Sequence, residues 1–472
     1  APIVLGLARG DYPLAPGIAP GRNDLGVMLP SSPLHHLLLS GPPAALVMTS
    51  ANQSSEPMIT GNRTACQELP VDAFLFHDRD ILFPTDDSVV RMIPRAPAFA
   101  SPLSSGERGA RSSTQRFPQL SDERGATLSA PEYPIRSGKR GESPPVFVRR
   151  ARGYVPAALE ARFLPQRTVL ALGAELKVTV TTLQQGRLVV GRHLGDLDDA
   201  RTEQVFHQEV QRVLGLERLQ PERVAVDLHP DLISRLLGEQ LADPGALVRV
   251  QHHHAHLCAV MVEHGISPER RVTGIILDGV GLGEDNTIWG GEILSGGYGG
   301  YQRVGHLRPV PQPGGDRAAR EPGRMAISLL LDAGLEGAGV ALDKEDIAAI
   351  CGSRAVSPLT SSAGRLFDGA AAILGLAPEV QGYEGEAAAL LEAAADPGCA
   401  DAYSLPLQGS ELDTRELTTA LVQDRSPIPI RAARFHNALA DALALLALTA
   451  GNDTVALGGG CLVNRLLLTR LE

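Results

Sequence analysis

Residues 247–256 read Leu-Val-Arg-Val-Gln-His-His-His-Ala-His, and this stretch decides the fold class. Its first four residues have the composition of a short buried strand, and the histidines begin a helix. A strand that passes directly into a helix is typical of α/β proteins, which bind ligands at the ends of their strands. The four-residue spacing places His252 and His256 on one face of the predicted helix.

A histidine pair of this kind can hold one divalent metal and leave coordination positions for a carboxylate and a ligand. Taken alone, the pair is equally compatible with a hydrogen-bonded histidine cluster at a helix start. Asp278 changes this balance, because it ends the next predicted buried strand, residues 274–278. The sequence therefore predicts a metal site formed by His252, His256 and Asp278.

Glycines recur after the predicted strands and allow backbone N–H groups to approach a phosphate closely. One such segment, residues 173–177, follows the strand 169–172, and another, residues 458–464, follows the strand 454–457. Each turn is weak evidence singly, but their order along the chain predicts an actin-like nucleotide fold. The candidate nucleotide-binding residues of this part are Lys177, Gly279, Gly281, Gly459, Gly460 and Asn464.

The N-terminal part also has the strand and helix rhythm of an α/β fold. Residues 25–29 and 45–49 are predicted to be buried strands, each followed by polar turn residues. Hydroxyl, amide and guanidinium groups at strand ends can bind phosphate and a small planar acid. Without further context, ordinary turn residues are the better interpretation. The candidates here are Thr49, Ser50, Asn52, Ser88 and Arg91.

Composition limits the class of protein. The 472 residues carry a net charge of −11, which disfavours a general nucleic-acid binder. Five widely spaced cysteines without a Cys-x-x-Cys motif argue against a disulfide framework or a zinc finger. The apolar run 438–450 is too short to span a membrane, and the N-terminus lacks the basic start of a secretory signal. We therefore expect a cytoplasmic protein of two or three domains without nucleic-acid or membrane partners.

Residues 96–145 are rich in Ser, Gly, Pro, Arg and Glu and have almost no apolar periodicity. Such a segment cannot bury enough surface to offset its ordering entropy, which predicts a disordered insertion. Its arginines are interleaved with acidic residues, so a solvated linker is favoured over an RNA-binding arm. The expected organisation is a domain in 1–95, the insertion in 96–145, a closing segment in 146–160 and a second domain in 161–472.

Taken together, these motifs resemble the HypF-type carbamoyltransferases. The first domain is similar to a YrdC-type domain, with Arg150 in its closing segment, and residues 161–472 resemble a duplicated actin-like carbamoyl-transfer domain. Motifs of the first domain lie at 25–30, 33–37, 47–52, 77–79, 86–91 and 149–156. Motifs of the second lie at 173–177, 193–197, 227–231, 251–256, 278–281, 289–292, 313–316, 321–324, 383–386, 434–437 and 459–464.

The resemblance implies a relay between two sites. The YrdC-type domain joins carbamate, released from carbamoyl phosphate, to ATP in the presence of Mg²⁺, and this gives carbamoyl-adenylate. The actin-like domain, with iron or zinc at the histidine pair, passes the carbamoyl group to the C-terminal cysteine of a partner, HypE. That product leads to the cyanide ligands of [NiFe]-hydrogenase. By similarity, His252, His256 and Asp278 are metal ligands, whereas no catalytic residue is assigned.

Departures from the family pattern lie at the two ends. The chain begins after the basic motif that opens the YrdC-type domain and stops before the last expected metal ligand, so we expect both domains to be partial. This expectation leaves a non-catalytic nucleotide-binding fragment as one alternative. Another O- or N-carbamoyltransferase of the same superfamily is a second, although the order of the domains and the acidic charge favour the HypF type.

Overall fold

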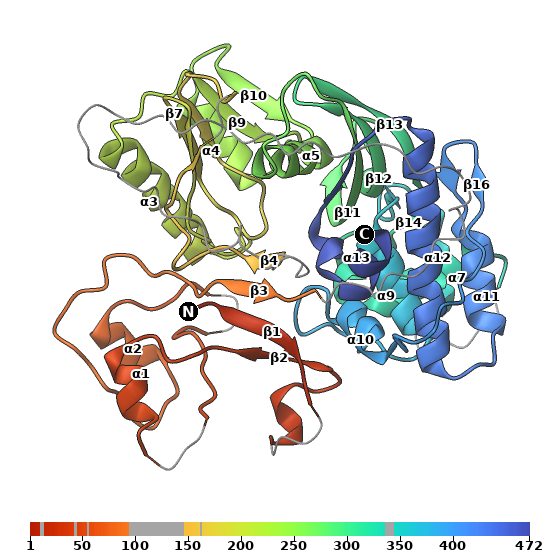
Figure 1. Ribbon diagram of the computed structural model, residues 1–472, viewed down its shortest axis with the longest axis horizontal. Helices are drawn as coiled ribbons and strands as arrows, with labels where there is room; N and C mark the ends of the chain where they lie inside the picture. The colour runs from red at the N-terminus through yellow and green to blue at the C-terminus, as the bar shows by residue number, and fades with distance from the viewer. Residues whose placement is uncertain (10–13, 42–44, 54–55, 94–145, 161–162, 336–343) are drawn as a thin grey trace, which may run out of the picture.

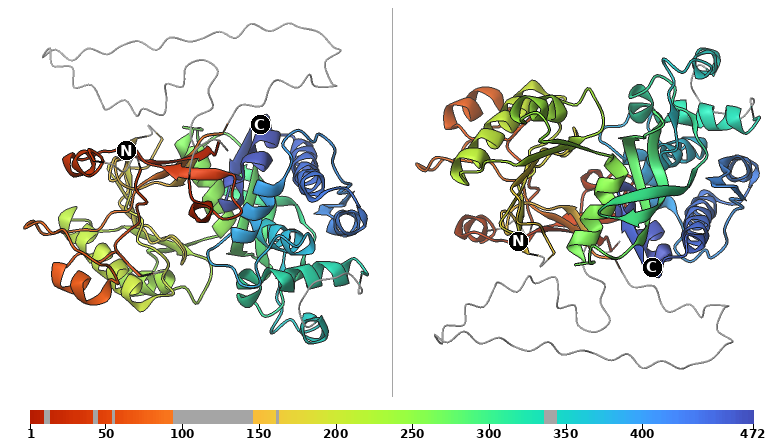
Figure 2. Two further views of the ribbon diagram at one scale, coloured as in Figure 1. Left: turned by 90° about the horizontal axis from the view of Figure 1, so that it is seen from below. Right: turned by 90° about the horizontal axis from the view of Figure 1, so that it is seen from above.

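The computed structural model describes residues 1–9, 14–41, 45–53, 56–93, 146–160, 163–335 and 344–472. Residues 96–145, expected to be a disordered insertion, lie outside the described residues. The described chain is α/β throughout, which confirms the predicted fold class. It forms an N-terminal unit (residues 1–93 and 146–158), a first lobe (159–263) and a second lobe (272–472) (Figure 1). Both views of Figure 2 show the yellow-green first lobe and the blue second lobe on opposite sides.

The N-terminal unit is built on a four-stranded sheet with the order β2-β1-β3-β4. β1 pairs antiparallel with β2 and parallel with β3, and β4 pairs antiparallel with β3. The residues after the undescribed stretch therefore return to the sheet that the first residues begin. The elements are β1 (Ile3–Leu7), η1 (Pro16–Ile18), β2 (Asp24–Val27), α1 (Pro33–Leu38), α2 (Asn62–Glu68), β3 (Val89–Arg91) and β4 (Val146–Arg149).

The predicted buried strand at residues 45–49 is wrong. These residues have no regular secondary structure, and the side chain of Val47 is 81% exposed. An apolar run becomes a buried strand only where a neighbouring strand pairs with it and another layer covers it. The strand predicted at 25–29 is present as β2, which pairs with β1, but it is not buried as expected, because Val27 and Leu29 are 56% and 70% exposed.

The first lobe contains a six-stranded sheet with the order β10-β9-β6-β7-β8-β5. β6, β9 and β10 run parallel, so their carboxyl ends meet at one edge. In α3, the side chains of Phe206, Val210 and Val213 pack into the core of this lobe. The elements are β5 (Leu159–Glu160), β6 (Val169–Ala171), β7 (Thr181–Gln184), β8 (Arg187–Val190), α3 (Ala200–Leu216), β9 (Arg223–Asp227), α4 (Ile233–Leu241), β10 (Leu247–Val250) and α5 (His252–Glu263).

The second lobe is formed around an eight-stranded sheet in which β12 pairs with β11, β13 and β15. Its strands are β11 (Val272–Leu282), β12 (Ile288–Gly297), β13 (Gly300–Leu307), β14 (Val310–Pro311), β15 (Leu359–Thr360), β16 (Leu407–Gln408), β17 (Glu411–Leu412) and β18 (Val455–Gly458). Its helices are α6 (Arg317–Arg320), α7 (Pro322–Asp332), α8 (Lys344–Cys351), α9 (Ala363–Ile373), α10 (Glu386–Ala394), α11 (Thr414–Gln423), α12 (Ile428–Thr449), η2 (Gly460–Val463) and α13 (Arg465–Leu471).

The strand predicted to end at Asp278 is longer than expected. β11 continues to Leu282, and its register with β12 shifts between Leu277 and Gly281. The reason is that β12 offers partners on both sides of this irregularity, so the glycine-rich segment stays extended. Among the helices within the described ranges, none is long and apolar enough to cross a bilayer.

Candidate metal centre

The three predicted metal ligands lie together at the junction of the two lobes. His252 and His256 project from the first two turns of α5, and Asp278 lies in β11. The Nε2 atoms of His252 and His256 are 3.3 and 2.9 Å from Asp278 Oδ2. One donor atom from each of the three residues lies within 4.8 Å of the others. Of the residues that the structure describes, this is the one cluster of three such donors with metal-site spacing.

The start of α5 is fixed by its own cap. Gln251 occupies the N-cap position, and its side-chain oxygen accepts a hydrogen bond from the backbone N–H of His254 at 2.9 Å. Its amide nitrogen donates to the carbonyl oxygen of Leu282 at 3.1 Å, which ties the helix to β11. This cap therefore sets the position of the histidine pair relative to the strand that carries Asp278.

Asp278 is held in its ionised form. Burial alone would raise its pKa, but the hydrogen bonds with His252 and His256 outweigh burial and hold the pKa well below the usual range. The backbone N–H of Gly279 donates to Asp278 Oδ1 at 2.8 Å and fixes the second carboxylate oxygen. An ionised, oriented carboxylate beside two imidazoles is a suitable donor set for a divalent metal.

Asp227 is a site residue that the sequence analysis missed as a functional group. It ends β9 and accepts a hydrogen bond from His252 Nδ1 at 2.8 Å, so the other ring nitrogen faces Asp278. Burial lowers the pKa of His252, but Asp227 and Asp278 together raise it to about 10. A carboxylate behind a histidine ligand fixes its tautomer and orientation in metal sites. No signal in the local sequence identifies Asp227, because its place beside the start of α5 follows from the parallel pairing of Asp227 with Val250.

The residues fit a metal on their chemistry as well as on their spacing. Two imidazole nitrogens and one carboxylate oxygen converge, which is the three-ligand pattern of catalytic sites that retain an open position. The glycines beside these three residues lie so close to them that there is little room for a side chain. A Cβ on Gly281 would lie 2.5 Å from the His253 ring, and a Cβ on Gly460 would lie 3.2 Å from Asp278 Oδ1.

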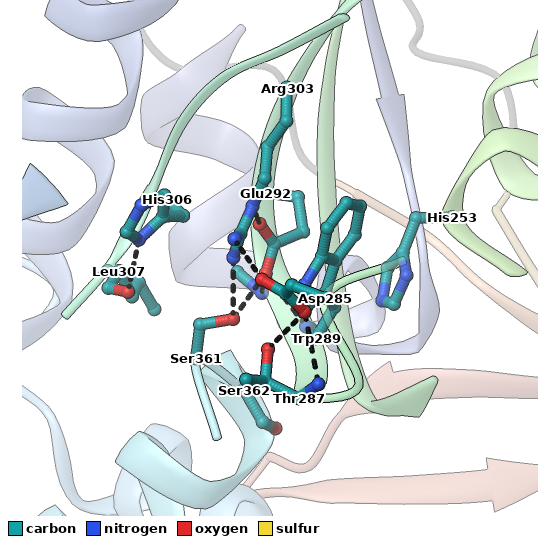
Figure 3. A network of polar contacts seen from close by, with 12 residues as sticks. His253, Asp285, Thr287, Trp289, Glu292, Arg303, His306, Leu307, Ser361 and Ser362 are labelled. Atoms are coloured by element: carbon teal, nitrogen blue, oxygen red, sulfur yellow. Dashed lines mark hydrogen bonds and ion pairs between the residues drawn. The ribbon is translucent and has the colours of Figure 1, made fainter. Parts of the chain in front are cut away.

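A network of polar contacts around the buried Glu292 supports β12, which pairs with the strand that carries Asp278 (Figure 3). Glu292 is fully buried and accepts hydrogen bonds from Arg303 Nε at 2.6 Å and from the backbone N–H of Gly290 at 3.1 Å. The guanidinium of Arg303 lies 4.1 Å from the centre of the Trp289 ring, which is itself beside His253. Burial lowers the pKa of His253 to about 3, so this neighbour of the ligands stays neutral.

The candidate nucleotide-binding residues of the lobes differ in how they lie relative to the candidate metal centre. Gly459 lies in a turn that touches the metal centre, with a φ of +96°, and a Cβ there would meet the Leu277 carbonyl oxygen. Gly279 faces open space. Lys177 belongs to the first lobe and forms an ion pair with Glu384 of the second lobe. Asn464, by contrast, is buried and caps α13 through a hydrogen bond from the backbone N–H of Leu467 at 3.0 Å.

The candidate binding residues of the N-terminal unit differ in exposure and in their hydrogen-bond partners. Thr49 and Ser50 are exposed, and Asn52 donates to the backbone oxygens of its own loop. Ser88 is buried, and its hydroxyl donates to the Arg152 carbonyl oxygen at 3.0 Å. Arg150 donates to the carbonyl oxygen of Tyr154 at 2.8 Å.

Arg91 is the exception, because its side chain extends from the N-terminal unit to the second lobe. Its guanidinium contacts Asp24 Oδ2 at 2.6 Å and also reaches Glu392 of the second lobe at 3.0 Å.

Comparison with known proteins agrees with this architecture. Residues 1–100 match a YrdC-type family described as "Telomere recombination", residues 165–263 match the "HypF Kae1-like domain", and residues 274–472 match "Carbamoyltransferase, Kae1-like Domain, second subdomain". Carbamoyltransferase HypF of Rhodobacter capsulatus is 40% identical over 99% of this chain and 58% of its own length. A HypF homolog of Cupriavidus necator is 41% identical over 64% of this chain and 83% of its own length.

Solved structures give the same result. Full-length HypF in a phosphate- and nucleotide-bound form has a TM-score of 0.84 and 29% identity, covering the whole of this chain and 57% of that one. HypF of T. kodakarensis has a TM-score of 0.82, with 28% identity over the whole of this chain.

The fold and the site define a class: a YrdC-type unit joined to a Kae1-like domain, with a candidate metal site at the junction of its two lobes. Within that class, the chain belongs to the HypF carbamoyltransferase family. It spans about 58% of the length of the first curated relatives that it matches.

Proposed function

We propose that this chain carries the carbamoyl-transfer centre of [NiFe]-hydrogenase maturation. In this proposal the N-terminal unit contributes to the formation of carbamoyl-adenylate from ATP, with Mg²⁺, and carbamate derived from carbamoyl phosphate. The lobes then transfer the carbamoyl group to the C-terminal cysteine of HypE in the cytoplasm. The observation that carries the proposal is the convergence of His252, His256 and Asp278 beside a glycine turn.

Iron or zinc at this centre would act as a Lewis acid on the carbamoyl oxygen or anchor the phosphate. His252 and His256 would supply Nε2, and Asp278 would supply Oδ2. Asp227 accepts the Nδ1 proton of His252, so Nε2 is the ring nitrogen that would bind the metal after giving up its own proton.

The backbone around Asp278 is arranged to accept an adenylate. Gly279 presents open space next to the carboxylate, and Gly460 lies beside the Oδ1 atom of the same carboxylate. Side chains at these positions would occupy the space that a phosphate needs. Across the lobes, Lys177 and Glu384 form an exposed ion pair. A bound phosphate would compete with Glu384 for Lys177.

The test is a two-stage assay with ATP, carbamoyl phosphate, iron or zinc, and a HypE protein that ends in its native cysteine. AMP and pyrophosphate release measures the first stage, and intact mass of HypE measures the transfer. We expect Asp278→Asn to abolish transfer and to reduce bound metal to background. His264→Gln is the matched control, because His264 follows the same helix but is exposed and outside the donor cluster.

Two results would overturn the proposal. One is carbamoylation of HypE by Asp278→Asn at the rate of the unsubstituted chain. The other is no transfer by the unsubstituted chain when synthetic carbamoyl-adenylate is supplied directly, since that removes any dependence on the first stage.

A further inference from the structure

One turn of the second lobe touches the metal centre at one end and the N-terminal unit at the other. It consists of Gly459 and η2, between β18 and α13. At its near end, Gly459 packs on the backbone of Leu277 and Gly460 lies beside Asp278 Oδ1. The near end is therefore part of the wall around the Asp278 carboxylate.

The far end of this turn has an anchor inside its own lobe. His436 is fully buried in α12, and its Nδ1 donates to the Ala432 carbonyl oxygen at 2.7 Å. Its Nε2 is left to accept a hydrogen bond from Asn464 Nδ2 at 3.0 Å. Asn464 in turn caps α13. The buried histidine thus fixes the residue that directly follows the turn.

The far end has a second anchor that comes from the N-terminal unit. Arg91 ends β3, and its NH1 atom donates to the Val463 carbonyl oxygen at 2.6 Å. The same atom contacts Glu392 of α10 at 3.0 Å, and Glu392 accepts a hydrogen bond from the backbone N–H of Arg465 at 3.1 Å. Arg91 and Glu392 therefore hold the turn and the start of α13 jointly.

This contact is buried and charged, unlike an ordinary surface ion pair. The side chains of Arg91, Asp24 and Glu392 are 9%, 12% and 8% exposed. Removing the guanidinium would leave two carboxylates with little solvent and one backbone carbonyl without this donor. Breaking a buried pair on one side is strongly destabilising for the groups left behind.

We propose that Arg91 is a positioning residue for the metal centre. The N-terminal sheet, through Arg91, holds the Gly459–Val463 turn against Asp278, so its contact with the second lobe sets how tightly the centre holds its metal. Only one 3-10 turn separates Val463 from Gly460, and a shift at one end is carried to the other. The proposal rests on the metal site of the proposed function and adds a route by which the N-terminal unit acts on it.

The experiment compares two arginines that both link the N-terminal unit to the lobes. Arg91→Gln removes the contact with the turn. Arg201→Gln is the matched control, because Arg201 of α3 pairs with Glu56 and Glu68 of the N-terminal unit but contacts neither the turn nor Glu392. Co²⁺ is the metal probe, read by its absorption spectrum and by titration. Hydrogen exchange of peptides covering 459–464 is the second readout and needs no metal.

For Arg91→Gln we expect faster exchange in 459–464 and about tenfold weaker Co²⁺ binding, the lower end of what loss of supporting contacts costs a metal site. Arg201→Gln should change neither quantity. Asn464→Ala should speed exchange in the same peptides, which calibrates the readout. Should Arg91→Gln fold poorly, Glu392→Gln keeps the side-chain shape and is expected to move both quantities in the same direction by less.

The proposal is overturned if exchange in 459–464 and Co²⁺ affinity are the same in Arg91→Gln and Arg201→Gln. A chain that binds no Co²⁺ before substitution would contradict the proposed metal centre instead. In that case the exchange measurement alone decides whether Arg91 holds the turn.

Discussion

The N-terminal unit and the two lobes bury their apolar side chains to very different extents. Among the described residues, the hydrophobic core clusters lie entirely within 170–467. In the described part of the N-terminal unit, the buried apolar side chains are those of Val90, Ile93 and Ala151. Many large apolar side chains of this unit face outward instead, for example Val47, Leu75 and Leu82 at 81%, 74% and 79% exposure.

The difference teaches that the two regions are held by different forces. The lobes are stabilised mainly by apolar burial, at roughly 25 cal/mol per Å². Polar contacts hold the N-terminal unit against the lobes, and both lobes take part in them. Arg192 and His193 of the first lobe contact the Pro84 carbonyl oxygen and Asp86, and Glu392 of the second contacts Arg91. The unit therefore depends on the lobes for its position more than they depend on it.

The largest expected effect is a core truncation in the second lobe. Phe435 is 1% exposed and packs edge-on against Phe367 at 5.3 Å. Phe435→Ala should lower the free energy of unfolding of the lobes by about 3–5 kcal/mol, because it leaves a cavity. Leu75→Ala in the N-terminal unit should change it by less than about 0.5 kcal/mol. Urea denaturation followed by circular dichroism measures both, and equal effects would break the comparison.

The next effect concerns metal affinity, which we expect to depend on a carboxylate of the lobes. Asp227→Asn should weaken Co²⁺ or Zn²⁺ binding by about 10–100-fold, because His252 loses the charged acceptor that orients it. Asp86→Asn is the control in the N-terminal unit, since Asp86 also contacts a histidine Nδ1, that of His193, at 3.1 Å. Competition titration with a chelating dye is the measurement. Equal losses in both variants would show that the effect is not specific to the centre.

The sequence predicted the parts of the lobes in which local pattern and tertiary environment agree. β10 and α5 lie where they were expected, and the structure brings His252, His256 and Asp278 together as predicted. β10 pairs with β9, and Leu257 and Met261 of α5 are fully buried, so local pattern and tertiary environment agree there. The failure at 45–49 has the opposite cause: the same kind of run lacks a pairing strand there.

Tertiary contacts account for the remaining differences. The part played by Asp227 depends on the parallel register of β9 and β10, which local sequence does not determine. The hairpin of β12 and β13 was not predicted, because its glycines resemble turns until β11 pairs alongside. Asn464 is one of the predicted nucleotide-binding residues, and its contacts with α13 and with the distant His436 could not be read from local sequence.

A smaller effect is expected from pH, and it should be confined to the lobes. Burial lowers the pKa of His436, so the folded state disfavours the protonated form. The unfolded chain then binds the proton more readily below about pH 6.5, and stability present above that pH is lost as pH falls. The free energy of unfolding should therefore be lower at pH 5.5 than at pH 7. Urea midpoints for His436→Gln should show a shallower pH slope between 7 and 5.5, and an unchanged slope would refute this assignment.

The smallest effect is expected where the N-terminal unit meets the first lobe through exposed charges. Arg201 is 53% exposed and contacts Glu56 and Glu68 at 2.7 and 3.0 Å. Exposed ion pairs of this kind contribute little and are screened by salt. Arg201→Ala should leave the urea midpoint of the lobes unchanged and speed hydrogen exchange only in peptides around 56–68, a difference that high salt should reduce. A shift of the midpoint would mean that this contact stabilises the lobes, and the dependence between the two regions would then run in both directions.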